Sequence, residues 1–143
     1  MTADATVGGR PLPALTAVNR PYWTSGADRV WRLQRCPACE RLLHPPALRC
    51  QYDHAVPEWV ELSGRGTVES WTVNHHPFFP GIPTPYVIAF VNPVEDSRVR
   101  VLTNLVDVDP ERIHAGMPVR VTFEFGSDDA DDDVYLPMFT PER

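Results

Sequence analysis

Cys36-Pro37-Ala38-Cys39, followed ten residues later by Cys50-Gln51-Tyr52-Asp53-His54, is the stretch that decides the fold. It holds all three cysteines of the 143-residue chain, whose start lacks the basic residues and apolar core of a secretion signal. Cysteines clustered in this way favour metal binding over disulfides. A zinc ribbon carries its fourth ligand three residues after the third cysteine, at Asp53, with His54 beside it. We therefore expect Asp53 as the fourth ligand and His54 as the alternative.

Three interpretations of this cluster compete. The first is a structural zinc ion held by three thiolates and one further ligand. The second is a degenerate ribbon that keeps the fold but binds zinc weakly or not at all, because the fourth ligand is no thiolate. The third is a redox or open catalytic metal site. A catalytic zinc keeps an open position with a base nearby, and the sequence shows no such base, so the structural site is favoured.

The rest of the chain predicts a mainly β protein with one short N-terminal helix. Asn19 followed by Arg20 and Pro21 is typical of a helix start. Strand patterns then recur, with residues 86–91 read as a strand buried on both faces; the other ranges are 66–74, 98–106 and 119–125. Residues 109–116 indicate a short helix between the third and fourth strands, which is the arrangement of a five-stranded OB-fold barrel.

We expect three parts along the chain. Residues 1–18, with Gly8, Gly9 and two prolines, are read as a flexible arm. Residues 19–57 hold the helix and a rubredoxin-like zinc ribbon, and residues 58–143 form the OB-fold barrel.

Composition narrows the class of partner. The formal net charge is -6, and all 13 basic residues are arginine. Nucleic-acid binders normally carry a basic excess, so the acidic balance disfavours them. Residues 127–133 are almost wholly acidic and are read as a solvated hairpin tip. No apolar run approaches the length of about 18 residues that spans a bilayer, so we expect a cytoplasmic protein without a membrane partner.

No catalytic residue is predicted, because the sequence holds neither a G-x-S-x-G elbow nor an H-E-x-x-H motif and leaves no cysteine outside the ribbon. Two interpretations are open for Trp23 and Trp31: they are core residues that cover the ribbon, or they contact a partner. For Phe78 and Phe79, too, both a structural role and a contact with a partner are open. Arg65 is either a turn residue or a contact to a CoA phosphate.

Several motifs in fixed order resemble a known family: the zinc-ribbon OB-fold proteins catalogued as domain of unknown function thirty-five. The matching pieces include Pro21-Tyr22-Trp23, Leu33 to Cys39, Pro45-Pro46, Cys50, Ser63 to Val68, Pro85-Tyr86-Val87, Asn104 to Asp109, Gly116 to Val119 and Leu136 to Phe139. The chain departs from the family's fuller zinc sites at Asp53, where those sites carry a fourth cysteine.

The resemblance implies an accessory role beside thiolase-fold enzymes that act on acyl-CoA thioesters, among them ketothiolases and lipid-transfer-protein-like steroid side-chain aldolases. The catalytic residues would belong to the partner, in a hetero-oligomer with two copies of each chain. The accessory chain would bind and stabilise the enzyme and help form its CoA-ester path. Two other hypotheses stay open, a free-standing acyl-CoA binding or carrier module and, disfavoured by charge, a single-strand nucleic-acid binder.

Overall fold

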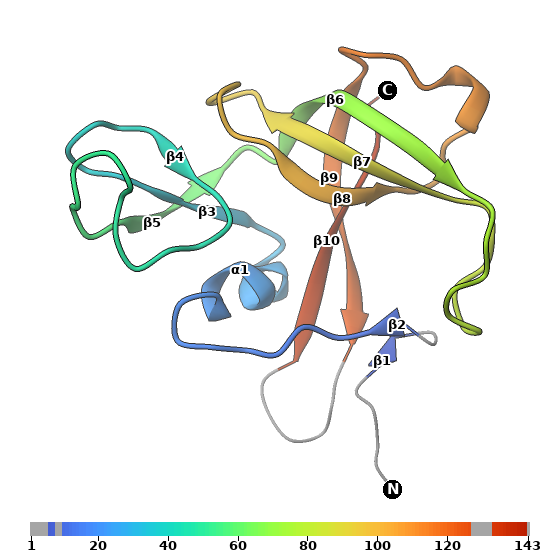
Figure 1. Ribbon diagram of the computed structural model, residues 1–143, viewed down its shortest axis with the longest axis horizontal. Coiled ribbons are helices and arrows are strands. Elements are labelled where there is room, and N and C mark those ends of the chain that lie inside the picture. Colours follow the sequence, from blue (N-terminus) through green and yellow to red (C-terminus); the bar gives the residue numbers. More distant parts are fainter. Residues whose placement is uncertain (1–5, 8–9, 127–132, 143) are drawn as a thin grey trace, which may run out of the picture.

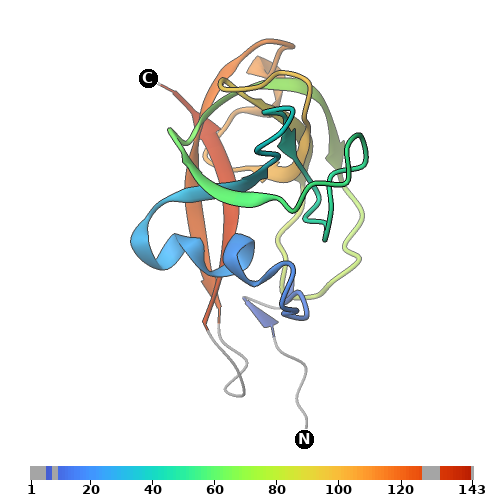
Figure 2. The ribbon, with the colours of Figure 1, turned by 90° about the vertical axis from the view of Figure 1, so that its left-hand side faces the viewer.

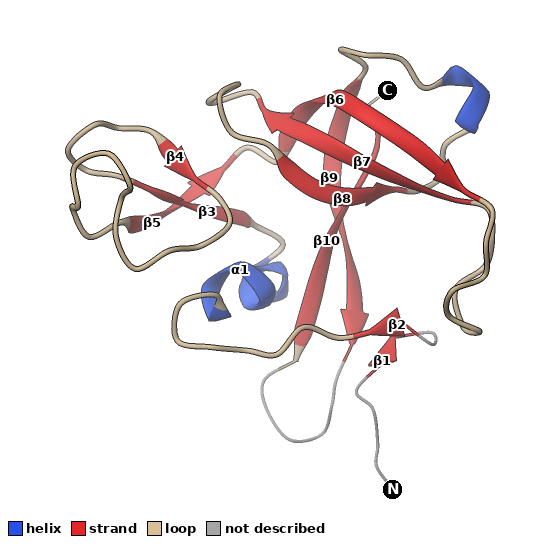
Figure 3. Ribbon diagram, viewed as in Figure 1, coloured by secondary structure: helices blue, strands red, loops and turns tan. Residues whose placement is uncertain are grey.

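A five-stranded barrel with a smaller three-stranded sheet beside it makes up most of the computed structural model (Figure 1). The structure describes residues 6–7, 10–126 and 133–142. The expected mainly β class is confirmed, and the helical segments are short (Figure 3). The predicted acidic hairpin tip lies almost entirely outside the described residues.

The barrel strands run in the order β10-β8-β7-β6-β9 and close on themselves. Their bounds are β6 (Arg65–Asn74), β7 (Tyr86–Pro93), β8 (Val101–Leu105), β9 (Pro118–Gly126) and β10 (Val134–Pro141). Neighbours are antiparallel except β10 and β8, which pair in parallel through Phe139 and Leu105. The 3-10 helix η2 (Pro110–Arg112) lies between the third and fourth barrel strands, as the OB-fold interpretation predicts.

Alternation along β7 corrects one expectation. Val87, Ala89 and Val91 are buried in the barrel, whereas Ile88 and Phe90 are only half-buried on its outer face. The run predicted to be buried on both faces is therefore buried on one, because successive side chains of a strand point to opposite faces. The outer face keeps large apolar side chains next to solvent.

Close strand pairing explains a glycine of the Ser63-Gly64-Arg65-Gly66 stretch. A Cβ at Gly66 would lie 2.6 Å from Val91 Cγ1 and 2.8 Å from the Asn92 carbonyl oxygen, so no side chain fits there. Gly64 has a φ of +85°, which is accessible to glycine at little cost. The motif is thus a turn that leads into the first barrel strand, β6.

The smaller sheet has the order β4-β3-β5, with β3 at Trp31–Arg35, β4 at Leu42–Leu43 and β5 at Glu58–Leu62. We call this sheet and its loops the ribbon. The expected boundary at residue 58 assigns β5 to the barrel, but β5 pairs with β3 along its whole length, from Trp31 opposite Leu62 to Arg35 opposite Glu58. The helix α1 (Arg20–Thr24) and the 3-10 helix η1 (Ser25–Asp28) precede the ribbon and pack against β10.

The ribbon and the barrel are joined by a shared core and by one buried carboxylate. Trp31 and Phe139 are both fully buried and stack edge to face with ring centroids 5.0 Å apart. In the turn between β7 and β8, Asp96 is 8% exposed and accepts hydrogen bonds from the Leu42 backbone N–H at 3.1 Å and from Arg98 Nε at 2.8 Å. This carboxylate therefore fixes the edge of the ribbon to the barrel.

The N-terminal residues that the structure describes lie against the barrel. The short strands β1 (Thr6–Val7) and β2 (Arg10–Pro11) pair with each other. Arg10 forms an ion pair with Glu124 at 2.9 Å and donates a hydrogen bond to Asn104 at 3.0 Å. In Figure 2 the loop between β6 and β7 runs toward this segment, and residues of both line one apolar groove.

Candidate metal centre

The first turn of the cluster links β3 to β4. The Glu40 N–H donates to the Cys36 carbonyl at 2.8 Å, and the Cys36 N–H donates to the Arg41 carbonyl at 2.9 Å. Glu40 has a left-handed φ of 64°, which reverses the chain directly after Cys39. The Cys39 N–H also points at Cys36 Sγ, at 3.4 Å. The turn thus presents the two sulfurs on the same side of the backbone.

The second turn repeats this pattern. The His54 N–H donates to the Cys50 carbonyl at 2.9 Å, the Cys50 N–H donates to the Ala55 carbonyl at 2.9 Å, and His54 has a φ of 63°. The Tyr52 N–H points at Cys50 Sγ, at 3.4 Å. Asp53 therefore occupies the place that Cys39 holds in the first turn, and His54 the place of the turn residue that follows.

The two turns bring four donor groups together: Cys36, Cys39, Cys50 and Asp53 lie with their ligand atoms within 4.8 Å of one another. The Cys39 and Cys50 sulfurs are 3.8 Å apart, and Cys36 Sγ is 3.3 Å from the Asp53 carboxylate. Tetrahedral zinc, with bonds of about 2.3 Å to sulfur and about 2.0 Å to oxygen, separates two sulfurs by about 3.8 Å and a sulfur from an oxygen by about 3.5 Å. These two pairs of donor atoms therefore have separations close to those around such an ion.

In the absence of an ion, the Asp53 carboxylate is charged at neutral pH whereas the Cys36 thiol is not. Cys36 and Cys50 are fully buried, and burial raises the pKa of the Cys36 thiol to about 11. The hydrogen bond from the Ala55 N–H, at 3.0 Å, lowers the pKa of Asp53. A divalent cation would hold the thiols deprotonated and balance the charge of the carboxylate. Four protein donors complete a tetrahedron, which is the composition of a structural site.

The structure places the other candidate residues as follows. His54 is exposed and does not belong to the four-donor group. Trp31 is 0% exposed, so of the two interpretations given for it the structure agrees with the core side chain. Arg65 forms an ion pair with Glu142 at 3.0 Å. Phe78 is 65% exposed and Phe79 42%, so both remain available on the surface.

One surface feature was not predicted from the sequence. An apolar groove, with a volume of about 500 Å³, lies between the N-terminal segment, the β6–β7 loop and the outer face of the barrel. Trp23 and Phe79 line it, together with Ile82, Leu102, Leu136 and Met138. The outward positions of β7 and β8 could have indicated this groove if the alternation of β7 had been recognised. Among the described residues, no helix is both long and apolar enough to cross a membrane.

Comparison with known proteins identifies relatives of the whole architecture. Residues 59–124 match the family model of the ChsH2 C-terminal OB-fold domain. The chain is 38% identical over 134 residues to a probable enoyl-CoA hydratase alpha subunit of Thermomonospora curvata. It is 43% identical over 103 residues to the 3-oxo-4,17-pregnadiene-20-carboxyl-CoA hydratase alpha subunit of Mycobacterium tuberculosis. It spans only 40% and 32% of the lengths of these two proteins.

A third relative is of similar size to the chain. A DUF35 domain-containing scaffold protein of Methanocaldococcus jannaschii is 32% identical over 103 residues, which cover 70% of this chain and 72% of that protein. Among solved structures, a chain of the Ltp2-ChsH2(DUF35) aldolase is 35% identical, with a TM-score of 0.78, over 91% of this chain and 98% of that chain. A DUF35 protein of Sulfolobus solfataricus, 14% identical with a TM-score of 0.61, shares the fold.

Proposed function

The chain belongs to the DUF35 family, and from this premise we propose that it is a non-catalytic accessory subunit of an acyl-CoA enzyme with the thiolase fold. It binds and stabilises that enzyme, a ketothiolase or a steroid side-chain retro-aldolase of the lipid-transfer-protein kind. The catalytic groups lie on the partner, and the accessory chain contributes to the path of the CoA ester.

One observation carries this proposal. The similarity to a chain of the Ltp2-ChsH2(DUF35) aldolase, at 35% identity, extends over 98% of that chain, so the ribbon, the barrel and their junction are all matched. That aldolase is named for two components, Ltp2 and ChsH2, and the M. jannaschii relative is named a scaffold protein. Both descriptions support a role in assembly.

The metal is part of the proposal. Cys36, Cys39, Cys50 and Asp53 would hold a zinc ion, with Asp53 as the fourth ligand. Since the ion would have four protein ligands and no open position, its contribution is to tie the two turns of the ribbon together. The Asp53 carboxylate is a weaker partner for soft metals than a fourth thiolate, so the affinity for zinc is lower than in a site with four cysteines.

The contacts with the partner are assigned to the exposed apolar side chains. Phe78 and Phe79 in the β6–β7 loop are the best placed, and Phe79 lines the apolar groove together with Trp23. Arg65 is a candidate CoA contact, although its ion pair with Glu142 would have to open. The assembly holds two copies of each chain and resides in the cytoplasm.

No hydratase activity is proposed for this chain. The two hydratase alpha subunits are more than twice its length, and the chain matches 40% and 32% of them. The similarity therefore does not support assigning the hydratase reaction to this chain.

Co-expression tests the proposal. A thiolase-fold enzyme encoded in the same genome would be produced with and without this chain, and its soluble yield and carbon–carbon lyase or thiolase activity on CoA esters measured. We expect activity to rise with added chain and to saturate at one accessory chain per enzyme chain. Equal yield and activity in its absence, across the thiolase-fold enzymes of that genome, would contradict the accessory role.

A further inference from the structure

Cys39 is the most accessible of the three cysteines at the metal centre. Cys36 and Cys50 are both fully buried, whereas Cys39 is only half-buried. The susceptibility of a cysteine to oxidation follows the exposure and the thiolate character of its sulfur. A dissolved oxidant therefore meets the Cys39 sulfur before it meets the other two.

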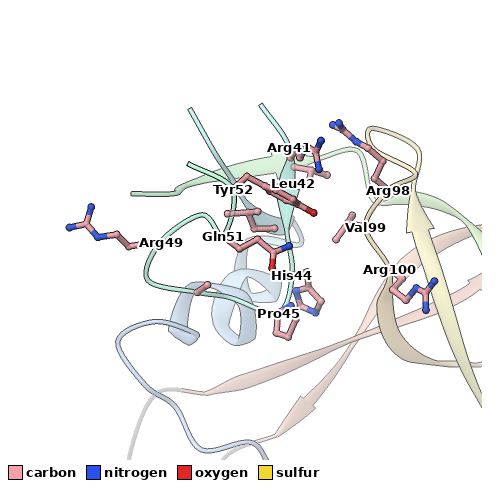
Figure 4. Close-up of a pocket in the computed structure, with 12 residues that line it drawn as sticks. Arg41, Leu42, His44, Pro45, Arg49, Gln51, Tyr52, Arg98, Val99 and Arg100 are labelled. Atoms are coloured by element: carbon pink, nitrogen blue, oxygen red, sulfur yellow. The ribbon is translucent and has the colours of Figure 1, made fainter. Parts of the chain in front are cut away.

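The surroundings of Cys39 carry positive charge. A cavity of about 280 Å³ between the ribbon and the β7–β8 connection is lined by Arg98 and by Arg41, which follows Cys39 by two residues. In Figure 4 these two arginine side chains extend at the same edge of the cavity. Hydrogen bonding to Asp96, together with the negative charges of Asp96 and Cys39, raises the pKa of Arg98. A partly exposed cysteine beside a cation is the setting in which thiolates are reactive.

Cys50 is the neighbour with which an oxidised Cys39 can pair. Their sulfurs are 3.8 Å apart, and a disulfide bond is about 2.0 Å long, so the remaining gap is small. Cys36 Sγ instead lies 3.3 Å from each oxygen of the Asp53 carboxylate. Because Cys39 and Cys50 belong to different turns of the ribbon, a disulfide between them would link the same two turns that a zinc ion links.

From these observations we propose that Cys39 is an oxidation site, at which hydrogen peroxide joins Cys39 and Cys50 in a disulfide and zinc is released. The Cys39 thiolate attacks one peroxide oxygen, the O–O bond breaks and hydroxide leaves, so that Cys39 becomes a sulfenic acid. The Cys50 thiolate then attacks the Cys39 sulfur. The S–S bond forms, the S–O bond breaks and a second hydroxide leaves. The two thiolates together lose two electrons, which the peroxide gains.

The release of zinc follows from the composition of the cluster. Once Cys39 and Cys50 are joined, only Cys36 and Asp53 remain as donors, and two protein ligands do not complete a tetrahedral site. The disulfide still ties the two turns together, and a thiol reductant reverses it. The inference depends on the proposed metal only for the release of zinc, since the disulfide itself requires the cysteines alone.

Peroxide treatment of the full zinc-loaded chain tests the proposal. Zinc release is followed with a chromophoric chelator, and disulfides are mapped by tandem mass spectrometry after digestion with trypsin. Trypsin cuts after Arg35, Arg41 and Arg49, so Cys50 leaves on a different peptide from Cys36 and Cys39. We expect zinc to be released as the Cys39 and Cys50 thiols are lost, with a disulfide that joins the two peptides at these residues. Dithiothreitol followed by zinc should restore the starting state.

Cys36→Ser and Cys39→Ser form a matched pair of variants, because each removes one thiolate from the cluster. Cys36→Ser should still form the disulfide between Cys39 and Cys50, whereas Cys39→Ser should form none under the same conditions. The mapping in the wild type does not depend on how well either variant folds.

Three results would overturn the proposal. They are a main product in which Cys36 is one of the linked residues, a disulfide in Cys39→Ser that forms as readily as in Cys36→Ser, and zinc release from the wild type without any disulfide. A chain that takes up no zinc but forms the disulfide between Cys39 and Cys50 would contradict the proposed metal and support the oxidation site.

Discussion

Replacing Asp96 by asparagine should loosen the junction between ribbon and barrel. The carboxylate accepts four hydrogen bonds: Oδ1 from the Arg98 N–H at 3.0 Å and Nε at 2.8 Å, and Oδ2 from the Leu42 N–H at 3.1 Å and Arg98 Nη2 at 2.9 Å. Asparagine keeps one acceptor and turns an NH2 group toward two of these donors. Since Arg98 is itself largely exposed, the charged contacts are discounted, and the expected loss is about 2–3 kcal/mol of unfolding free energy.

That loss corresponds to a fall in Tm of about 10 °C for a domain of this size. Thermal and urea unfolding with excess zinc at pH 7 would measure it. Asp28→Asn is the matched control, because Asp28 pairs with Arg32 at 3.3 Å at the surface, where its side chain is 67% exposed. The control should cost less than about 0.5 kcal/mol. If Asp96→Asn is no more costly than Asp28→Asn, the junction does not depend on the carboxylate.

The effect of Asp96 should also depend on pH. The hydrogen bonds from Arg98 lower the pKa of Asp96 from 3.8 to about 2. A carboxylate with a lowered pKa in the folded state stabilises the fold fully above its unfolded pKa and loses this contribution as the pH falls through the folded value. The difference in stability between Asp96→Asn and the wild type should therefore be constant above about pH 5 and shrink between pH 4 and pH 2. A difference that stays constant down to pH 2 would contradict this assignment.

Three further predictions concern the metal, the barrel and the partner. Asp53→Ala should weaken zinc binding by at least about a hundredfold in chelator competition, because the loss of groups that only support a ligand already lowers metal affinity by up to about a hundredfold. His54→Ala should leave the zinc affinity unchanged. A larger loss in His54→Ala than in Asp53→Ala would assign His54 as the ligand. Gly66→Ala should cost about 1–3 kcal/mol in urea unfolding, since its Cβ would lie 2.8 Å from the Asn92 carbonyl oxygen, and a neutral effect would show that the strands separate freely. Phe79→Ser should weaken partner binding by about thirtyfold if the β6–β7 loop carries the interface, with the exposed Val94→Ser as the control, and equal affinities of the two variants would move the interface elsewhere.

Local rules were sufficient for much of the fold. The Asn19-Arg20-Pro21 start predicted α1, which begins at Arg20, and the alternation in residues 119–125 predicted β9. The cysteine spacing predicted that Asp53 would join the three sulfurs, and the repeated turn explains why it does so rather than His54. These features depend on short stretches whose geometry is set by the nearest neighbours in the chain.

Features that depend on tertiary contacts were not predictable in the same way. The burial of Trp31 results from Phe139, more than a hundred residues away, and the hydrogen bond from Leu42 to Asp96 joins two separate parts of the chain. The cavity lined by residues of 41–52 and 98–100 likewise joins two separate parts of the chain. No periodicity or spacing in one segment reports which other segment will face it.

The central claim is that this chain works as a subunit of a thiolase-fold acyl-CoA enzyme. Its most direct test is the native mass of the complex that a tagged chain retains when it is purified gently from its own cells, with the proteins identified. We predict a thiolase-fold protein in near-equal molar amount and a mass equal to two copies of each chain. A chain that is recovered alone, even when the neighbouring genes are strongly expressed, would contradict the account.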